Sequence, residues 1–345
     1  MVDLNNFICI NPFTYTEIME DRQTFCCPQW LEEYIEGETI DYKQSWNSDK
    51  ALKIRQSMVN GSFKYCSTSK CPHLSTLINT GKLSRGPIKQ KTDSLVRSLT
   101  DSSMLGPKEI KFIFDQACNL ACPSCRNSFV RNSEEIYVNS TTKLEKLSDA
   151  YSNSVESISM SGAGDPFYSQ TFFEFLQNID IDKFPKLNRI HLHTNAILWN
   201  EHNWKKIKNS HSFIKSTEIS IDAATEKTYK VVRKGGNFEI LTRNLKFIST
   251  LRGIKSFIFS FVVQKENYTE LVDFHRYIES IFDRQMKMGL VSVTYTKVQN
   301  WGNLSEEGYN DMAVHQPKHP EHKLFLEEVN KLMSLQSPHV ITNLL

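Results

Sequence analysis

The sequence predicts an α/β protein in which a small cysteine-rich domain precedes a partial (β/α)6 barrel. Two observations predict this arrangement. From residue 109 onward, short segments with strand character alternate with helical segments, and five of the eight cysteines lie before residue 72. Alternation of this kind is typical of βαβ units that share a parallel sheet. Six such units are too few for a closed eight-stranded barrel, so a partial TIM-like barrel or an open sheet is expected.

The strand candidates are short and rich in β-branched and aromatic residues. They are 110–114, 155–160, 189–194, 217–221, 256–263 and 290–296. Helical periodicity follows at 142–152, 170–178, 200–209, 224–247 and 268–283, with a last amphipathic helix at 320–335. In both architectures ligands bind at the carboxyl ends of the strands. The loops that follow the strands are therefore where chemistry is expected.

Composition narrows the function classes. The 345 residues, 39% hydrophobic and 23% charged, are enough for two domains with sizeable cores. The 41 basic and 39 acidic side chains leave a net charge of +2, so neither nucleic acid nor a membrane surface is expected as a partner. The longest apolar run, 256–263, is too short for a membrane helix, and no signal peptide is visible. We expect a cytoplasmic protein with reduced cysteines.

Three cysteines follow the first predicted barrel strand, in the loop DQACNLACPSCRN. Cys118, Cys122 and Cys125 are spaced C-x3-C-x2-C, and the loop offers no obvious fourth ligand. A structural zinc site normally closes with four ligands. Three thiolates instead suit three irons of a 4Fe–4S cluster and leave its fourth iron open. Zinc completed by a distant side chain is the alternative, and the position directly after a strand favours the cluster.

This loop resembles the signature of the radical S-adenosylmethionine (SAM) superfamily, and the resemblance continues over 109–300. Members of the family use the open iron to chelate the amino and carboxylate groups of SAM. An electron from the reduced cluster then cleaves the sulfonium, which gives methionine and a 5′-deoxyadenosyl radical. The residue before the third cysteine is often aromatic in the family and is Ser124 here. This difference weakens the expected contact to the adenine.

The loops after the next three strands carry the residues that the resemblance assigns to SAM. The loop SGAGDPF offers glycines that let the backbone approach a ligand, and a plain glycine turn is the alternative. The resemblance implies that this loop holds the SAM ammonium, that Ser220 binds the ribose and that Arg233 binds the carboxylate. A purely structural ion pair between Asp222 and Arg233 is the alternative. The expected SAM-binding residues are Gly162, Gly164, Asp165, Asn195, Ser220, Asp222 and Arg233.

Several histidines could imitate a metal site. His191 and His193 alternate onto one face of the third strand, where core histidines with hydrogen-bond partners are favoured over metal ligands. The histidines of 315–322 are expected on an extended, solvated loop because prolines interrupt it. Three residues near the sixth strand have no firm role: Lys297, Gln299 and Trp301.

The N-terminal cysteines, by spacing alone, fit a zinc ribbon or an iron–sulfur site. The region from CCPQWLEE to KYCSTSKCP resembles the SPASM/Twitch auxiliary-cluster module of radical SAM enzymes, including Trp46-Asn47-Ser48 and Arg55. That module usually follows the barrel, whereas here it precedes it. The resemblance implies one 4Fe–4S cluster, the Twitch form. Its expected ligands are Cys9, Cys27, Cys66 and Cys71, with Cys26 able to replace Cys27.

Together these patterns predict an enzyme with four segments. The segments are the auxiliary domain at 1–78, a linker at 79–108, the radical SAM barrel at 109–305, and a C-terminal loop and helix at 306–345. The resemblance implies SAM, two 4Fe–4S clusters, a flavodoxin- or ferredoxin-type electron donor and a peptide substrate. Oxidation of a peptide or protein side chain, assisted by the auxiliary cluster, is favoured. The alternatives are dehydrogenation of an aminoglycoside or other small polyol, and a zinc-stabilised binding protein without catalysis.

Overall fold

The computed structural model divides the chain into two compact units. It describes residues 2–27, 30–31, 35–36, 40–84 and 86–345. The first unit contains Met1–Asp115, Glu134–Met160 and Asp180–Arg189, and the second contains Gln116–Ser133, Ser161–Ile179 and Ile190–Leu345. These units group residues by contact, so the functional division into four segments stays a prediction. Four residues of the motif CCPQWLEE, at 28–29 and 32–33, lie outside the described residues.

Six strands alternate with helices in the α/β part of the chain. The strands are β6 (Glu109–Phe112), β7 (Ser157–Met160), β8 (Arg189–Thr194), β9 (Ile214–Ser220), β10 (Ser256–Val263) and β11 (Val291–Lys297). The helices are α6 (Glu134–Tyr151), α7 (Gln170–Asn178), α8 (Glu201–Lys206), α9 (Glu226–Val232), α10 (Phe238–Ile248) and α11 (Leu271–Lys287). This is the chain order of a partial (β/α)6 TIM-like barrel with a mostly parallel sheet, which confirms the predicted α/β fold class.

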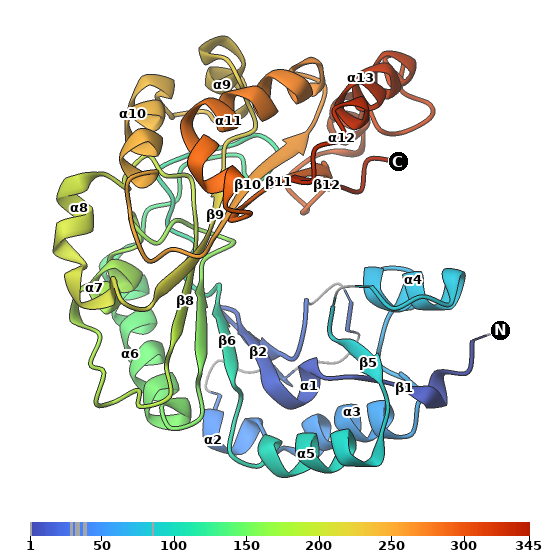
Figure 1. Cartoon of the computed structure of the whole chain (residues 1–345). Coiled ribbons are helices and arrows are strands. Elements are labelled where there is room, and N and C mark those ends of the chain that lie inside the picture. Colours follow the sequence, from blue (N-terminus) through green and yellow to red (C-terminus); the bar gives the residue numbers. More distant parts are fainter. Residues whose placement is uncertain (1, 28–29, 32–34, 37–39, 85) are drawn as a thin grey trace. The chain divides into compact units, whose positions relative to one another are not determined.

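The second unit contains the larger share of the barrel. Its strands follow the order β12–β11–β10–β9–β8 and pair in parallel throughout, with β12 at Val340–Thr342. Helices α8 to α11 form an outer layer over these strands (Figure 1). On β8 and β9 one face is buried and mostly apolar, with Thr194 and Thr217 as its polar members, whereas the other carries half-buried polar residues. Parallel strands are usually apolar on both faces, so this second face is suited to a polar ligand.

The first unit holds the N-terminal elements. Strands β2 (Tyr15–Ile18), β6 and β7 pair in parallel, β3 (Arg22–Thr24) and β4 (Ile35–Glu36) continue the sheet antiparallel, and β1 (Phe7–Cys9) pairs with β5 (Ile88–Gln90). The helices are α1 (Asn11–Thr14), α2 (Tyr42–Ser45), α3 (Asp49–Val59), α4 (Pro72–Thr80) and α5 (Asp93–Ser103). The short 3-10 helices of the chain are Leu4–Asn6, Lys208–Ser210 and Tyr268–Glu270.

Two predictions about local structure need correction. The segment 79–108, interpreted as a linker, contains β5 and α5, and α5 begins because the Thr92 side chain accepts a hydrogen bond from the Leu95 amide. The segment 315–322 is a series of turns in which His319 is buried, not an extended, solvated loop. The His319 ring bonds the Asp311 carbonyl and the His322 ring bonds the Val314 carbonyl. These bonds hold the segment between α12 (Glu306–Met312) and α13 (His322–Ser334).

Helix α6 begins at Glu134, earlier than the predicted start at 142. Its first turns lack a regular apolar stripe. Two glutamates in the first turn stabilise the helix start through their attraction to the positive end of the helix dipole. Within the described part of the chain, no helix combines the length and the apolar character that crossing a bilayer requires.

Candidate functional site

The three-cysteine loop lies in the second unit, between β6 and α6, and its backbone is fixed at several points. The Cys118 amide donates to the Val130 carbonyl at 2.9 Å, and the Ala121 amide donates to the Lys234 carbonyl at 2.9 Å. The Cys125 amide donates to the Cys122 carbonyl at 2.9 Å and closes a turn. Cys118 and Cys122 are buried, whereas Cys125 is exposed. The loop is therefore anchored both to its own continuation and to the segment after α9.

Two of the expected SAM-binding residues donate hydrogen bonds to these sulfurs. Arg233 Nη1 lies 3.6 Å from Cys122 Sγ, and Asn195 Nδ2 lies 3.8 Å from Cys118 Sγ. Burial raises the pKa of the Cys118 thiol to about 12. Burial also raises the pKa of Cys122, and the Arg233 guanidinium opposes that rise. Nitrogen donors of this kind stabilise a thiolate, the form that binds metal.

The donor set fits a 4Fe–4S cluster. Three thiols stand on one short loop, and Cys122 interacts electrostatically with both Cys118 and Cys125. The buried Nε of Arg233 has no hydrogen-bond partner among the described residues, so it can serve a ligand. Within the same described part, no three histidine, cysteine or acidic side chains already form a metal-binding group.

The glycine loop after β7 has an irregular backbone held by one carboxylate. Ser161 and Gly162 adopt φ values of +73° and +141°, and the second is a conformation that glycine adopts readily. Asp165 is buried, and its amide donates to the Ala117 carbonyl at 2.9 Å. One carboxylate oxygen accepts from the Phe167 amide at 2.9 Å. Asp165 thus ties the glycine loop to the start of the cysteine loop.

The other carboxylate oxygen of Asp165 reaches the end of β8. It accepts from the Thr194 hydroxyl and from the Asn195 amide, both at 2.8 Å. Burial raises the pKa of this carboxyl, and these hydrogen bonds oppose the rise. Because both oxygens already accept bonds from the protein, Asp165 acts by joining three loops. Its predicted contact with the SAM ammonium stays a prediction.

The loop after β8 is held by two asparagines that the sequence analysis did not single out. Asn195 Nδ2 also donates to Asn119 Oδ1 at 2.9 Å, which connects it to the cysteine loop. Behind the loop, the buried Asn244 donates to the carbonyls of Ala196 and Ile197 at 2.9 and 2.8 Å. Ala196 adopts φ +60°, and these bonds help to hold that unfavourable conformation. No short motif marks Asn119 or Asn244 in the sequence.

The strand histidines have hydrogen-bond partners, as expected, yet they are half-buried rather than in the core. His191 Nδ1 lies 2.9 Å from Ser216 Oγ, and His193 Nε2 lies 2.9 Å from Ser220 Oγ. His193 Nδ1 is also 3.9 Å from Glu218 Oε2. The hydroxyl of Ser220, the predicted ribose contact, is therefore oriented by a histidine on the neighbouring strand.

The predicted pair of Asp222 and Arg233 forms a buried ion pair at 2.8 Å. The second oxygen of Asp222 accepts from the Val262 amide at 2.7 Å. Burial lowers the pKa of the Arg233 guanidinium, but Asp222, Cys122 and Tyr229 together outweigh burial and raise the pKa above its usual value. The structural ion pair considered from the sequence thus exists, and the same guanidinium also contacts Cys122. Arg233 is fixed, charged and next to the cysteine loop.

The glycines after Arg233 let the cysteine loop pack closely. Gly235 adopts φ +92°, and a Cβ there would lie 2.5 Å from the Phe129 ring. Asn303 donates to the Pro123 carbonyl, between the second and third cysteines, at 2.9 Å. Segments from four loops therefore converge on the three cysteines.

The sequence profile of the radical SAM superfamily matches residues 112–278, a range that includes the three cysteines and every predicted SAM-binding residue. Residues 112–278 are therefore similar to the radical SAM superfamily. No curated protein matches the sequence at a significant level.

Solved structures similar to this chain include two of SuiB from Streptococcus suis. The structure bound to the precursor peptide SuiA is 14% identical, with a TM-score of 0.46, over 80% of this chain and 60% of SuiB. The structure bound to S-adenosylmethionine is 13% identical, with a TM-score of 0.45, over 86% and 63%. The structure of anSMEcpe with AdoMet and the Cp18Cys peptide is 17% identical, with a TM-score of 0.37, over 67% and 62%. The chain thus spans less than two thirds of the length of these proteins.

Outside residues 112–278, five cysteines lie in the first unit. Cys9 is the last residue of β1, and Cys26 and Cys27 follow β3. Cys66 pairs with Leu31 in an isolated antiparallel β-bridge, and Cys71 directly precedes α4. Burial raises the pKa of Cys9 to about 12, and Cys71 adds to the rise. Burial is also the main cause that raises the pKa of Cys26. Repulsion from the other N-terminal thiols raises it further, in the order Cys9, Cys66, Cys71 and Cys27. Cys26 therefore interacts electrostatically with the four other N-terminal cysteines.

The tryptophan and arginine of the N-terminal motif support the chain beside Cys9. Arg55 is buried, and its guanidinium donates to the carbonyls of Pro12 and Trp46 at 2.8 and 2.7 Å and to Asn47 Oδ1 at 2.9 Å. Burial lowers its pKa to about 10. Trp46 Nε1 donates to the Ser103 carbonyl at 2.5 Å, and the guanidinium lies 4.5 Å from the Trp46 ring. Trp46 and Arg55 therefore stabilise the fold of the first unit.

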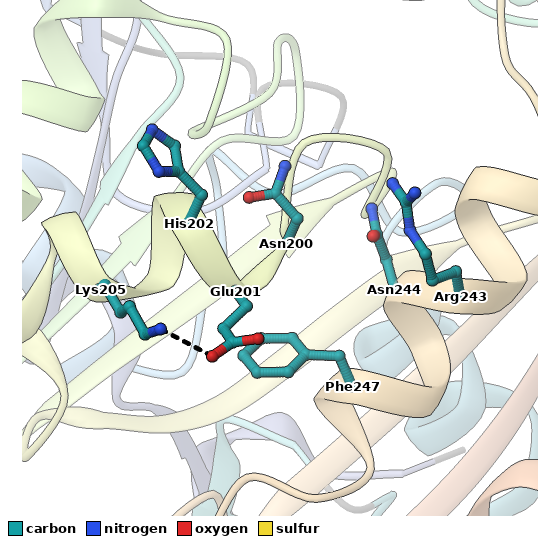
Figure 2. A pocket seen from close by; sticks show the side chains of 7 residues that line it. All are labelled: Asn200, Glu201, His202, Lys205, Arg243, Asn244 and Phe247. Carbon is teal, nitrogen blue, oxygen red and sulfur yellow. Dashed lines mark ion pairs between the residues drawn. The ribbon is translucent and has the colours of Figure 1, made fainter.

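A separate hollow of about 480 Å³ lies between α8 and α10 in the second unit (Figure 2). It is lined by Asn200, Glu201, His202, Lys205, Arg243, Asn244 and Phe247. Lys205 pairs with Glu201 at 2.7 Å. None of the predicted SAM-binding residues lines it, and Asn244 connects it to the loop after β8.

Proposed function

We propose that this protein is a radical SAM enzyme that reductively cleaves SAM to methionine and a 5′-deoxyadenosyl radical, which then abstracts hydrogen from a peptide or protein side chain. One observation carries the proposal. Arg233 and Asn195, two predicted SAM contacts, donate to the sulfurs of Cys122 and Cys118. The cysteine loop and the SAM loops therefore belong to one site within the radical SAM domain.

Each side chain has a defined task in this proposal. Cys118, Cys122 and Cys125 would hold a 4Fe–4S cluster, which when bound supplies the open iron for SAM and the electron for cleavage. Arg233, kept charged by Asp222, binds the SAM carboxylate through its planar donor fork. Ser220, oriented by His193, binds a ribose hydroxyl.

The loops provide the remaining contacts. Gly162 and Gly164 bring backbone groups close to the SAM ammonium. Asp165 holds this loop against Asn195 and against the start of the cysteine loop. The protein thus fixes the amino and carboxylate ends of SAM from two different loops, which orients the sulfonium for cleavage.

A second cluster in the first unit is part of the proposal. Cys9, Cys66 and Cys71, with Cys26 or Cys27, would hold a 4Fe–4S cluster that assists oxidation of the substrate. The resemblance to the SPASM/Twitch module supports this cluster and the peptide substrate. A small flavodoxin- or ferredoxin-type protein is the proposed electron donor.

The test is the release of 5′-deoxyadenosine from SAM by the anaerobically reconstituted, dithionite-reduced protein. We expect release by the wild type and none by the C118A/C122A/C125A variant. Ser128→Ala, at an exposed position in the same loop and without a thiol, is the matched control and should retain release. Release that survives the triple variant would overturn the proposal. Iron and sulfide analysis separates it from a zinc protein, which would be colourless.

A further inference from the structure

The turn that follows β9 is held in an unfavourable conformation by a segment distant in sequence. Asp222 adopts φ +61°, which residues with a Cβ rarely adopt. Asn267, fully buried in the connection from β10 to α11, donates from Nδ2 to the Asp222 and Val262 carbonyls at 2.9 Å each. Its Oδ1 accepts from the Gln264 amide at 2.8 Å. The Asn267 amide group therefore fastens Asp222 to the end of β10.

Glu270, from the same connection, holds the next part of the turn. Its carboxylate accepts from the amides of Ala224 and Thr225 at 2.6 and 3.3 Å. It also accepts from the hydroxyls of Thr225 and Thr228 at 2.6 and 2.5 Å. Ala224 and Thr225 directly precede Glu226, the first residue of α9, and Thr225 is its N-cap. The buried Glu270 carboxylate satisfies their amides, so it fixes the turn that leads into α9.

The two ends of α9 belong to the same site. Asp222 lies just before the helix, and Arg233 lies just after its last residue, Val232. These two side chains meet in the 2.8 Å ion pair, and Arg233 also contacts Cys122 Sγ. Loss of the support at the start of α9 would therefore change the position of the guanidinium at its end.

We propose that Asn267 and Glu270 are positioning residues of the SAM site. They hold segment 222–233 so that Arg233 presents its guanidinium both to the SAM carboxylate and to the cysteine loop. The inference rests on the proposed function, since SAM is the ligand whose binding depends on this position. Neither residue needs to touch SAM.

The experiment compares SAM binding to wild type, E270Q and E266Q by equilibrium dialysis of the cluster-loaded protein. The E270Q substitution keeps the size of the side chain but replaces one carboxylate oxygen by an NH2 group, which cannot accept from the amides and hydroxyls that now donate to Glu270. We therefore expect SAM affinity to fall by about tenfold or more. Glu266, exposed in the same connection, is the matched control and should leave affinity unchanged. Thr228→Val, which removes one of the four hydrogen bonds to Glu270, should give a smaller loss in the same direction.

A second readout does not need the cluster. In hydrogen–deuterium exchange of the cluster-free protein, segment 222–233 of E270Q should exchange faster than in the wild type, while strands β8 and β11 remain unchanged. Equal SAM affinity in wild type and E270Q, or faster exchange spread evenly over the second unit, would overturn the inference. Failure of the wild type itself to bind SAM would instead reject the proposed function, so the two failures are distinguishable.

Discussion

The cysteines of the two units differ in what surrounds them. In the second unit, Cys118 and Cys122 receive N–H groups from Asn195 and Arg233, and the guanidinium opposes the rise in the Cys122 pKa. In the first unit, the groups that shift the pKa of Cys26 are other thiols, and each raises it. Deprotonation of one thiol there makes deprotonation of the next harder, and a cation is needed to relieve the repulsion. The fold thus supplies N–H donors to the cysteines of the second unit, whereas we expect the N-terminal cysteines to depend more on a bound metal for their arrangement.

Removal of iron is expected to have the largest effect, and it tests directly whether the two units differ in their dependence on metal. We expect chelation under reducing conditions to raise hydrogen exchange strongly at 7–9, 26–27 and 66–71, because metal binding and folding are coupled where the ligands lack other support. Strands β8 to β11 should remain protected. Exchange measured by mass spectrometry that rises equally in both units would contradict the comparison.

Removal of Arg233 tests whether the second unit is shaped by the fold. R233A leaves the Asp222 carboxylate buried and unpaired, and we expect a loss of about 3–5 kcal/mol in the free energy of unfolding. Urea denaturation measures it. Arg243→Ala, at an exposed position on α10, is the control and should change stability little. A similar small loss in R233A would show that the ion pair does not support the site.

Substitution of the adjacent N-terminal cysteines sharpens the comparison in the first unit. Since Cys26 interacts electrostatically with Cys9, Cys66 and Cys71, we expect it to be a ligand, and C26S to lose about four iron atoms per chain, one 4Fe–4S cluster. C27S should retain about eight. Iron and sulfide analysis of the reconstituted proteins checks both. The reverse result would assign Cys27 as the ligand, as the sequence first favoured.

The smallest expected effect concerns the packing of the cysteine loop. Gly235 and Gly253 adopt similar φ values, +92° and +98°, but a Cβ at Gly253 meets nothing within 4 Å. Both alanine variants carry the backbone cost of about 1–2 kcal/mol. Only G235A must also displace the Phe129 ring, which adds a further, smaller cost because that ring is exposed and can move. Equal thermal stability of the two variants would show that Phe129 does not hold the loop.

The sequence predicted elements well where pattern and packing agree. The ranges of β8, β10 and α7 were predicted without error because apolar or β-branched residues define them and polar residues end them. Helix α5 was missed because few of its side chains are apolar, and Leu99 is the hydrophobic residue that it buries. The prediction for 315–322 was wrong because its histidines form hydrogen bonds with backbone carbonyls that come into reach only in the folded chain.

The candidate site was predictable as far as local motifs reach. The cysteines and Asp222 with Arg233 stand out by spacing, and the structure brings them together. Asn244, Asn267 and Glu270 could not be found in this way. Each acts on backbone groups of a loop far away in the sequence, so no local pattern records the partner. The proposed ligand roles of the predicted residues still await the tests above.

The carboxylate of Asp165 has a consequence for how such a site can change. It accepts from the loops after β7 and β8, and its own amide bonds the residue before Cys118. An insertion or a new sequence in any one of these three loops would disturb the other two. Transplanting this centre into another barrel would therefore require all three loops as one unit, and natural variation in substrate should be found outside them.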